Sequence, residues 1–469
     1  MHTAELYAIF LKNPVVTTDS RNCPSGSIFF ALRGEKFDGN DYIEQALSNG
    51  AAFAVGDRED LPQDNRIIRV DNALKSLQDL ANYHRKKLNP KVIAITGTNG
   101  KTTTKELIAV ALSTTYTVLY THGNLNNHIG VPLTLLRLKP EHRFAIIEMG
   151  ANHIGEIRDL CRIADPDFGL ITNVGKAHLE GFGSFEGVVR AKTELYDYIR
   201  EKGGSVFVNI DNPILKERSE NTNRIFYGTS PEAFVRGRIV DSGDGLELEY
   251  EETCSFEPSL SQKSVIPSLT RNPLEMHADN QGIAGQARND KAWTLIKTQL
   301  VGNYNFENVL AAICISKYFE VETEHSQFIK AIANYSPTNN RSQNLKTERN
   351  HLIIDAYNAN PSSMQVALDN FFSLKVSPKM VILGEMKELG EYSEEEHQKL
   401  FDRLSENSID MVILCGENFR NISSKPPELL VFLHTQDLLD YLKDGNISGF
   451  HILIKGSRTN QLERTIEFL

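Results

Sequence analysis

The chain has 469 residues, 40% of them apolar, and a formal net charge of −11. This length predicts about three domains, and the apolar content excludes a disordered chain. The negative charge argues against a nucleic-acid or anionic-membrane partner. The five cysteines are scattered without metal-ligand spacing, which is typical of reduced thiols. The N-terminus lacks the pattern of a signal peptide and no apolar stretch approaches a membrane span, so we expect a soluble, cytoplasmic protein.

Residues 1–88 predict a small α/β domain. Apolar runs at 28–32 and 51–55 indicate strands, and 41–49 and 73–87 indicate helices. The second helix runs into Asn89-Pro90, where the proline disfavours helix in the residue before it. We therefore place a domain boundary after residue 88.

Residues 93–106 read IAITGTNGKTTTKE: an apolar run, a loop of small residues and a helix-forming segment. Small residues allow backbone N–H groups to converge on phosphate oxygens. Lys101 is then expected at the β/γ-phosphates and the Thr102 hydroxyl at Mg²⁺. Ile95 occupies the position of the first glycine in the usual spacing, so a glycine-rich turn with an incidental lysine is the alternative. The predicted nucleotide-binding residues of this segment are Gly97, Thr98, Asn99, Gly100, Lys101, Thr102 and Thr103.

From residue 91 the chain alternates strand and helix, with continuous apolar strands at 92–95, 144–148, 169–173 and 205–210. Such strands are typical of a buried parallel sheet. Three of them end in or run into a polar residue: Glu148, Asn173 and Asp211. Because ligands of open parallel sheets bind at the carboxyl ends of the strands, these three are candidate site residues.

Residues 224–300 look rich in strands, but about 255–290 has neither strand nor helix period. We interpret that stretch as an insertion in a hairpin connection; the alternative is an ordered lid over the site. A helix at 308–318 ends the central domain, 89–335. Residues 336–469 predict a second doubly wound α/β domain, with strands at 352–355, 380–383, 411–415, 429–433 and 452–455 and helices at 362–374, 394–405 and 436–443.

Further motifs lie outside the phosphate loop: GNLNNHIG at 123–130, EMGANHIGEI at 148–157, GKAHLE at 175–180, GNYNFENVLAA at 302–312 and DAYNANPSSM at 355–364. With them, nearly the whole chain resembles the ATP-dependent Mur ligases; only the stretch near 255–290 has no counterpart. The resemblance implies three α/β domains: a small UDP-sugar-binding domain, a central phosphate-loop ATPase domain with a parallel sheet, and a Rossmann-like C-terminal domain.

EMGANHIGEI together with DAYNANPSSM is typical of one branch of that family. The resemblance therefore implies a cytoplasmic monomer that joins D-alanyl-D-alanine to UDP-N-acetylmuramoyl-tripeptide in peptidoglycan precursor synthesis. A substrate carboxylate attacks the γ-phosphate of ATP, and the amine then attacks the resulting acyl phosphate. Such phosphoryl transfer depends on positioning of the groups and neutralisation of their charge. The implied cofactors are ATP and two Mg²⁺ ions.

The resemblance assigns catalytic and metal-binding roles. Lys101 and Arg341 are cations at the phosphates, with Arg341 arriving when the domains close. Thr102 and Glu148 bind Mg²⁺, and His178 binds a second ion. Lys192 matches a lysine that is carbamylated in related ligases. From the residues alone, a surface glutamate is the alternative for Glu148, although its strand-end position argues against that. A surface lysine is the alternative for Lys192, and a structural role is the favoured interpretation of His178.

The remaining implied roles concern the nucleotide and the substrates. Tyr304 replaces a usual histidine beside the nucleotide, and Asn40 replaces another near the sugar. Lys455 and Ser457 are predicted to touch the dipeptide or the γ-phosphate, although a simple turn explains them equally well. The other implied contacts are Asn305, Asn308 and Asp355 for ATP, Ser20 and Arg21 for the sugar nucleotide, and Asn124, Asn126 and Asn127 for the peptide arm.

Three other functions fit parts of the sequence. A Mur-type ligase for a diamino acid or a folate polyglutamate ligase shares the chemistry. The presence of DAYNANP and the absence of an Asp-Asn-Pro-Arg motif argue against the diamino-acid enzyme. A nucleotide-dependent switch needs neither a sugar-binding first domain nor Lys192. An inactive homologue, its site blocked by the insertion, is opposed by the presence of Lys101, Glu148, His178 and Asp355.

Overall fold

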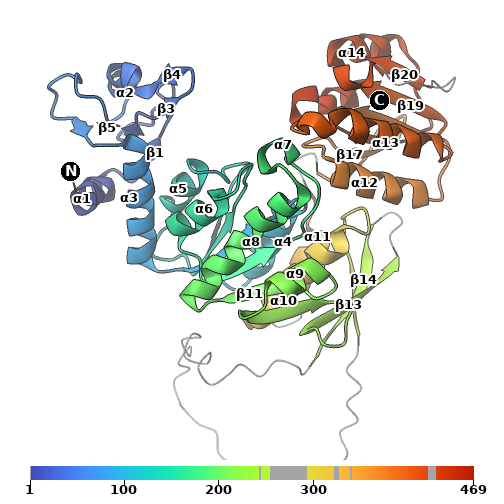
Figure 1. Ribbon diagram of the computed structural model, residues 1–469, viewed down its shortest axis with the longest axis horizontal. Helices are drawn as coiled ribbons and strands as arrows, with labels where there is room; N and C mark the ends of the chain where they lie inside the picture. Colours follow the sequence, from blue (N-terminus) through green and yellow to red (C-terminus); the bar gives the residue numbers. More distant parts are fainter. Residues whose placement is uncertain (1, 242–244, 254–292, 322–326, 338–340, 421–428) are drawn as a thin grey trace, which may run out of the picture.

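A computed structural model describes residues 2–241, 245–253, 293–321, 327–337, 341–420 and 429–469. Figure 1 shows three lobes that follow the chain: a small N-terminal lobe in blue, a central lobe from light blue through green to yellow, and a C-terminal lobe in orange and red. Each lobe contains its own main sheet. This three-part α/β architecture confirms the predicted fold class, while the exact boundaries at 88 and 335 stay predictions.

The N-terminal sheet is parallel throughout, in the order β1-β2-β5-β6. Its strands are β1 (Val16–Thr17), β2 (Ile28–Phe30), β5 (Phe53–Gly56) and β6 (Ile67–Arg69), with a small hairpin of β3 (Arg33–Gly34) and β4 (Phe37–Asp38) and helices α1 (Thr3–Lys12), α2 (Ile43–Ser48) and α3 (Ala73–Leu88). The helix predicted at 41–49 is divided, because a 3₁₀ turn (Gly39–Tyr42) precedes α2. Helix α1 and strands β1 and β6 were not predicted.

Helix α3 joins the first two lobes. Its buried His84 ring bonds the carbonyl of Leu138 at 3.0 Å, and Arg85 Nε donates to the carbonyl of Ala164 at 3.1 Å. Its apolar face belongs to a hydrophobic core that continues into the central lobe. Asn89, in the left-handed conformation (φ 50°), ends the helix just before Pro90. The N-terminal lobe is thus attached through a packed helix.

The central sheet has the order β15-β14-β13-β12-β11-β10-β7-β9-β8 and is parallel from β8 to β13. Its strands are β7 (Lys91–Thr96), β8 (Val118–Tyr120), β9 (Phe144–Glu148), β10 (Phe168–Ile171), β11 (Ser205–Asn209), β12 (Asn223–Gly228), β13 (Val235–Asp241), β14 (Glu247–Glu252) and β15 (Thr294–Lys297). Strands β8 and β13 were not predicted. Strands β14 and β15 pair antiparallel, as the predicted hairpin requires; the predicted insertion at 255–290 lies outside the described residues.

The helices of the central lobe cover both faces of its sheet. They are α4 (Lys101–Leu112), α5 (Gly130–Leu135), α6 (Glu156–Ala164), α7 (Leu179–Phe182), α8 (Phe185–Lys202), α9 (Pro213–Arg218), α10 (Asn305–Tyr318) and α11 (Gln327–Asn334). Helix α10 begins three residues before the predicted start at 308. That extra turn places both predicted asparagines, Asn305 and Asn308, on the helix.

The C-terminal sheet has the order β16-β17-β21-β18-β19-β20, parallel except for the edge strand β16. Its elements are β16 (Gln343–Lys346), β17 (His351–Asp355), α12 (Pro361–Ser373), β18 (Lys379–Gly384), α13 (Ser393–Ser405), β19 (Met411–Cys415), β20 (Leu429–Phe432), α14 (Thr435–Asp444) and β21 (His451–Lys455). All predicted strands and helices of this lobe are present; strand β16 and the 3₁₀ segments, such as Leu462–Phe468, were not predicted. Among the helices in the described ranges, none is both long and apolar enough to cross a membrane.

Candidate active site

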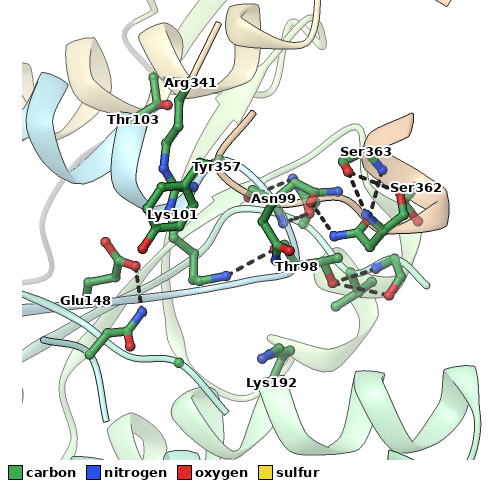
Figure 2. A pocket seen from close by; sticks show the side chains of 18 of the residues that line it. Thr98, Asn99, Lys101, Thr103, Glu148, Lys192, Arg341, Tyr357, Ser362 and Ser363 are labelled. Carbon is green, nitrogen blue, oxygen red and sulfur yellow. Dashed lines mark hydrogen bonds between the residues drawn. The ribbon is translucent and has the colours of Figure 1, made fainter. Parts of the chain in front are cut away.

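A cavity of about 1010 Å³ lies where the central and C-terminal lobes meet. Its wall contains most of the site residues that the sequence predicted: Thr98, Asn99, Gly100, Lys101, Thr103, Asn124, Asn126, Asn127, Glu148, His178, Lys192, Asn305, Asn308, Arg341, Asp355 and Lys455. Figure 2 shows several of them, with Lys192 rising from a helix on one side and Arg341 facing it across the phosphate loop. Residues more than 350 positions apart in the chain therefore share one site.

The loop between β7 and α4 is shaped by two glycines with positive φ. At Gly97 (φ 143°) an added Cβ would lie 2.0 Å from Thr172 Oγ1, and at Gly100 (φ 78°) it would lie 2.5 Å from Asn308 Oδ1. Side chains are therefore excluded at both positions. The loop leads directly into α4, whose first N–H groups have no partner within the helix and form a natural site for phosphate.

Asn173, beyond the end of β10, fixes the loop. Its carbonyl accepts the Thr98 N–H, and its side-chain oxygen accepts the Asn99 N–H, both at 3.0 Å. Thr172 Oγ1 donates to the carbonyl of Asn99 at 2.6 Å. Asn173, a candidate from its position at a strand end, thus holds the phosphate loop and lines the cavity. Asp211 has another task, because its carboxylate accepts the Thr229 N–H at the ends of β11 and β12 and does not line the cavity.

The Lys101 ammonium folds back over the loop. Nζ donates to the carbonyls of Gly97 at 2.7 Å and Thr98 at 3.1 Å. Burial, together with the charge of the nearby Arg341, lowers the pKa of Lys101 to about 8, while Glu148 opposes the shift. A phosphate arriving at the loop would supply the negative charge that this cation lacks.

Glu148, the last residue of β9, is buried beneath the phosphate loop. Its Oε2 accepts the Thr102 hydroxyl at 3.0 Å, and its Oε1 accepts Asn126 Nδ2 at 2.9 Å. The burial and these hydrogen bonds exclude the alternative that Glu148 is a surface residue. A carboxylate beside a hydroxyl and an amide is a set of hard oxygen groups that suits Mg²⁺.

A buried lysine that the sequence analysis missed accompanies Glu148. Lys105, fully buried one turn into α4, has Nζ 3.8 Å from Glu148 Oε2 and 3.5 Å from Glu106 Oε1. It balances charge beneath the loop. The signal available in the sequence was a second lysine four residues after the first, which by itself reads as an ordinary helix surface.

Lys192 lies inside the lobe and is only 2% exposed. Its Nζ donates to the carbonyl of Ala151 at 3.4 Å and lies 5.2 Å from the centre of the Phe182 ring. Burial lowers the pKa of Lys192 to about 7, helped by the charge of Lys101 and opposed by Glu156 and Glu194. The burial of the side chain excludes the alternative that Lys192 is a surface residue. A neutral amine that borders a cavity is the form that CO₂ modifies.

His178 caps α7 in the left-handed conformation (φ 50°), and its ring Nδ1 pairs with the Glu388 carboxylate. Glu388 comes from the C-terminal lobe and also has a positive φ, 61°. The hydrogen bond from His178 lowers the pKa of Glu388. Glu388 was not predicted from the sequence, because nothing local indicates a partner about 200 residues away. His178 therefore lies at the contact between two lobes as well as at the cavity.

The start of α10 supports the loop through a chain of amides. Asn308 Oδ1 accepts the Thr104 hydroxyl at 3.0 Å, and Asn308 Nδ2 donates to Asn305 Oδ1 at 3.0 Å. Asn305 Nδ2 in turn donates to the carbonyl of Val301 at 2.8 Å. The Tyr304 hydroxyl is hydrogen-bonded to Ser342 Oγ at 2.7 Å. Both asparagines thus shape the site from behind the loop.

The C-terminal lobe contributes an arginine and an ion pair. The Arg341 guanidinium stacks over the Tyr357 ring at 3.7 Å from its centre. Lys455 Nζ, at the end of β21, donates to Asp355 Oδ2 at 2.5 Å and to the carbonyl of Asn358 at 3.2 Å. In this structure the buried Lys455 is thus occupied with Asp355, the predicted ribose ligand. Its contact with the dipeptide or the γ-phosphate remains a prediction.

Three predicted substrate residues are not at the cavity. Ser20 and Arg21 belong to the N-terminal lobe, where Arg21 pairs with Asp19 and its side chain is 82% exposed. Ser457 is buried and bonds Asn460 Oδ1 at 2.6 Å. Asn40 is also buried, held by Asp38 and Asp57. The roles of Ser20, Arg21 and Ser457 stay predictions.

Comparisons with known proteins agree with this geometry. Residues 14–85 match the family model of the Mur ligase family, catalytic domain; residues 95–316 match the Mur ligase middle domain; and residues 340–458 match the Mur ligase, glutamate ligase domain. The order of the lobes and the phosphate loop facing the C-terminal lobe define the class: a three-domain ATP-dependent ligase of the Mur type.

The chain belongs to the Mur ligase family, and its full-length relatives place it in the MurF branch. UDP-N-acetylmuramoyl-tripeptide–D-alanyl-D-alanine ligase of Bacillus subtilis (strain 168) is 32% identical over 97% of this chain and 92% of its own. The Escherichia coli (strain K12) enzyme of the same name is 32% identical over 99% of this chain and 95% of its own. MurF from Acinetobacter baumannii superposes with a TM-score of 0.80 at 28% identity, covering 96% and 92% of the two chains. The Thermotoga maritima MurF ligase, solved in complex with ADP, superposes with a TM-score of 0.79 at 25% identity. The match covers 98% of this chain and 97% of that one.

Proposed function

We propose that this chain is an ATP-dependent amide ligase that joins D-alanyl-D-alanine to UDP-N-acetylmuramoyl-tripeptide, a step of peptidoglycan precursor synthesis in the cytoplasm. The observation that carries the proposal is one cavity that contains a phosphate loop, a buried carboxylate and a buried lysine of lowered pKa. Relatives of the same length that carry the ligase name support the choice of substrates.

ATP would lie between the central and C-terminal lobes. The loop and the start of α4 face one side of the cavity, while Asp355 and Arg341 face it from the other. In this arrangement the N–H groups of α4 and the Lys101 ammonium hold the phosphates, Asp355 takes the ribose, and Arg341 approaches the transferred group. Enclosure between the lobes keeps water from the acyl phosphate.

Mg²⁺, when bound, neutralises the charge that develops on the transferred phosphoryl group. Thr102 and Glu148 fit a first ion, since a hydroxyl and a buried carboxylate already lie 3.0 Å apart. His178 and Lys192 line the same cavity and fit a second ion if Lys192 is carbamylated, because the modification replaces a cation with an oxygen-bearing anion. Asn126 keeps the Glu148 carboxylate oriented through its 2.9 Å hydrogen bond.

The sugar nucleotide would be held by the N-terminal lobe, with Ser20 and Arg21 at the uridine end. Its peptide arm would reach the cavity past Asn124, Asn126 and Asn127, which line the wall on that side. The C-terminal carboxylate of the tripeptide then faces the γ-phosphate. We assign the three domains to 1–88, 89–335 and 336–469, and we propose a monomer.

A coupled phosphate-release assay tests this function. We expect turnover only when ATP, UDP-N-acetylmuramoyl-tripeptide and D-alanyl-D-alanine are all present. Diaminopimelate, lysine or glutamate as acceptors, each offered with the matching Mur or folate donor, serve as controls. Turnover with one of those sets alone would indicate another ligase of this type, and ATP hydrolysis independent of any acceptor would indicate a nucleotide-dependent switch.

A further inference from the structure

The phosphate loop is held by the C-terminal lobe as well as by its own. Asn360 Nδ2, at the N-cap of α12, donates to Asn99 Oδ1 at 3.0 Å. The two residues are 261 positions apart; Asn360 is buried, and both residues line the cavity. This is a direct side-chain bond between the loop expected to hold the phosphates and the opposite wall of the site.

The orientation of the Asn360 amide is fixed by its own helix. Its Oδ1 accepts the Ser363 N–H at 2.8 Å, and Ser363 Oγ accepts the Asn360 N–H at 3.1 Å, which completes a capping box. Because the oxygen is committed to the cap, the NH₂ group must face Asn99. The contact is therefore specified by the fold of α12 and does not depend on a free choice between amide nitrogen and oxygen.

A second contact beside the first also joins the start of α12 to the central lobe. Ser362 Oγ accepts the Lys176 N–H at 2.8 Å. The preceding residue, Gly175, is tied to the phosphate loop, since its N–H donates to Thr98 Oγ1 at 2.9 Å and its carbonyl accepts that hydroxyl at 3.2 Å. Figure 2 shows Asn99 and Thr98 on the side of the loop that faces Ser362 and Ser363. The first turn of α12 thus touches the loop at two neighbouring points.

We propose that Asn360 is a positioning residue that couples docking of the C-terminal lobe to the ATP-binding geometry of the phosphate loop. It contacts the loop through Asn99 and needs no contact with ATP itself. When the C-terminal lobe is docked, the hydrogen bond from Asn360 holds Asn99 and the phosphate loop in place. When that lobe moves away, the loop loses this restraint. The inference rests on the proposed use of this loop for ATP.

The test is a double-mutant cycle on Asn360 and Asn99 in the full chain. Asn360→Ser keeps an N-cap oxygen for α12 but is too short to reach Asn99, and Asn99→Ala removes the acceptor. The readouts are kcat/KM for ATP and the dissociation constant of a non-hydrolysable ATP analogue with Mg²⁺. For one lost hydrogen bond we expect each single variant to weaken both by about three- to tenfold, and the double variant to be no worse than the weaker single variant.

Two controls separate positioning from folding. Asn72→Ser changes the N-cap of α3, where Asn72 accepts the Lys75 N–H at 2.7 Å, and should leave both readouts unchanged. Glu396→Gln breaks another contact between the lobes, the 3.0 Å ion pair with Lys176 Nζ, and its effect should simply add to that of Asn99→Ala. Additive effects of Asn360→Ser and Asn99→Ala, or an unchanged Asn360→Ser, would overturn the proposal. Because analogue binding needs no acceptor, it also separates this failure from a failure of the proposed ligase reaction.

Discussion

Lys101→Met is expected to lower kcat by about 10³-fold, because it removes the cation closest to the transferred phosphate. Methionine keeps the length of the side chain, so the loop should retain its shape around Gly97 and Gly100. The Lys101 ammonium already lies within 3.1 Å of two loop carbonyls, and burial lowers its pKa to about 8, a shift that a bound phosphate would oppose. Steady-state phosphate release at saturating substrates measures the loss.

Lys87→Met is the matched control for this variant. Lys87 lies on α3 in the N-terminal lobe, stacked over the Tyr83 ring, and has no part in the cavity. Its replacement should leave kcat within about twofold. If Lys101→Met kept more than a tenth of the wild-type kcat while Lys87→Met behaved normally, phosphate binding by this loop would be refuted.

Lys192→Ala should lose most of the activity, by about 10²-fold or more, if the working group is a carbamate that positions a metal ion. Small carboxylates such as acetate or formate should restore part of the activity, since they place an anion in the space that the side chain leaves. Lys202→Ala, at the exposed end of the same helix, is the control, because Lys202 pairs with Asp165 and Asp167 and does not line the cavity. Full activity of Lys192→Ala would exclude the carbamate role.

The same lysine predicts a pH dependence for reactivation by CO₂. Below a pKa of about 7 the amine is protonated and cannot react; above it the neutral form dominates. An ordinary lysine would be only about 0.4% neutral at pH 8. At equal concentrations of dissolved CO₂, enzyme depleted of CO₂ should therefore regain activity much faster at pH 8 than at pH 6. Equal rates at the two pH values would show that Lys192 is not the group that responds.

The sequence was most informative where a function depends on a local pattern. The phosphate loop needs its small residues in one short segment, and Glu148 and Asn173 follow from the rule that parallel strands end at one edge. Asp211 obeys the same pattern, yet its carboxylate bonds the turn after β12. A strand end therefore indicates a candidate position, and only the three-dimensional neighbours decide whether a ligand or the chain itself uses it.

Contacts between distant segments could not be predicted in this way. Glu388 beside His178 and Asn360 beside Asn99 come from the C-terminal lobe, and periodicity carries no information about which loops will meet. Lys105 looked like a helix surface residue, but α4 is covered by α10 and α11, so its charge is fully buried. Strands β13 and β16 were missed because they are partly exposed and lack the continuous apolar run that identified the other strands.

The measurement that most directly tests the reaction is oxygen transfer from the tripeptide. UDP-N-acetylmuramoyl-tripeptide labelled with ¹⁸O in its C-terminal carboxylate is incubated with ATP, Mg²⁺ and D-alanyl-D-alanine, and the released phosphate is analysed by mass spectrometry. An acyl phosphate requires one carboxylate oxygen to leave with the phosphate, so each phosphate formed with product should carry one ¹⁸O. Phosphate without the label, alongside normal product formation, would contradict activation of the carboxylate by ATP.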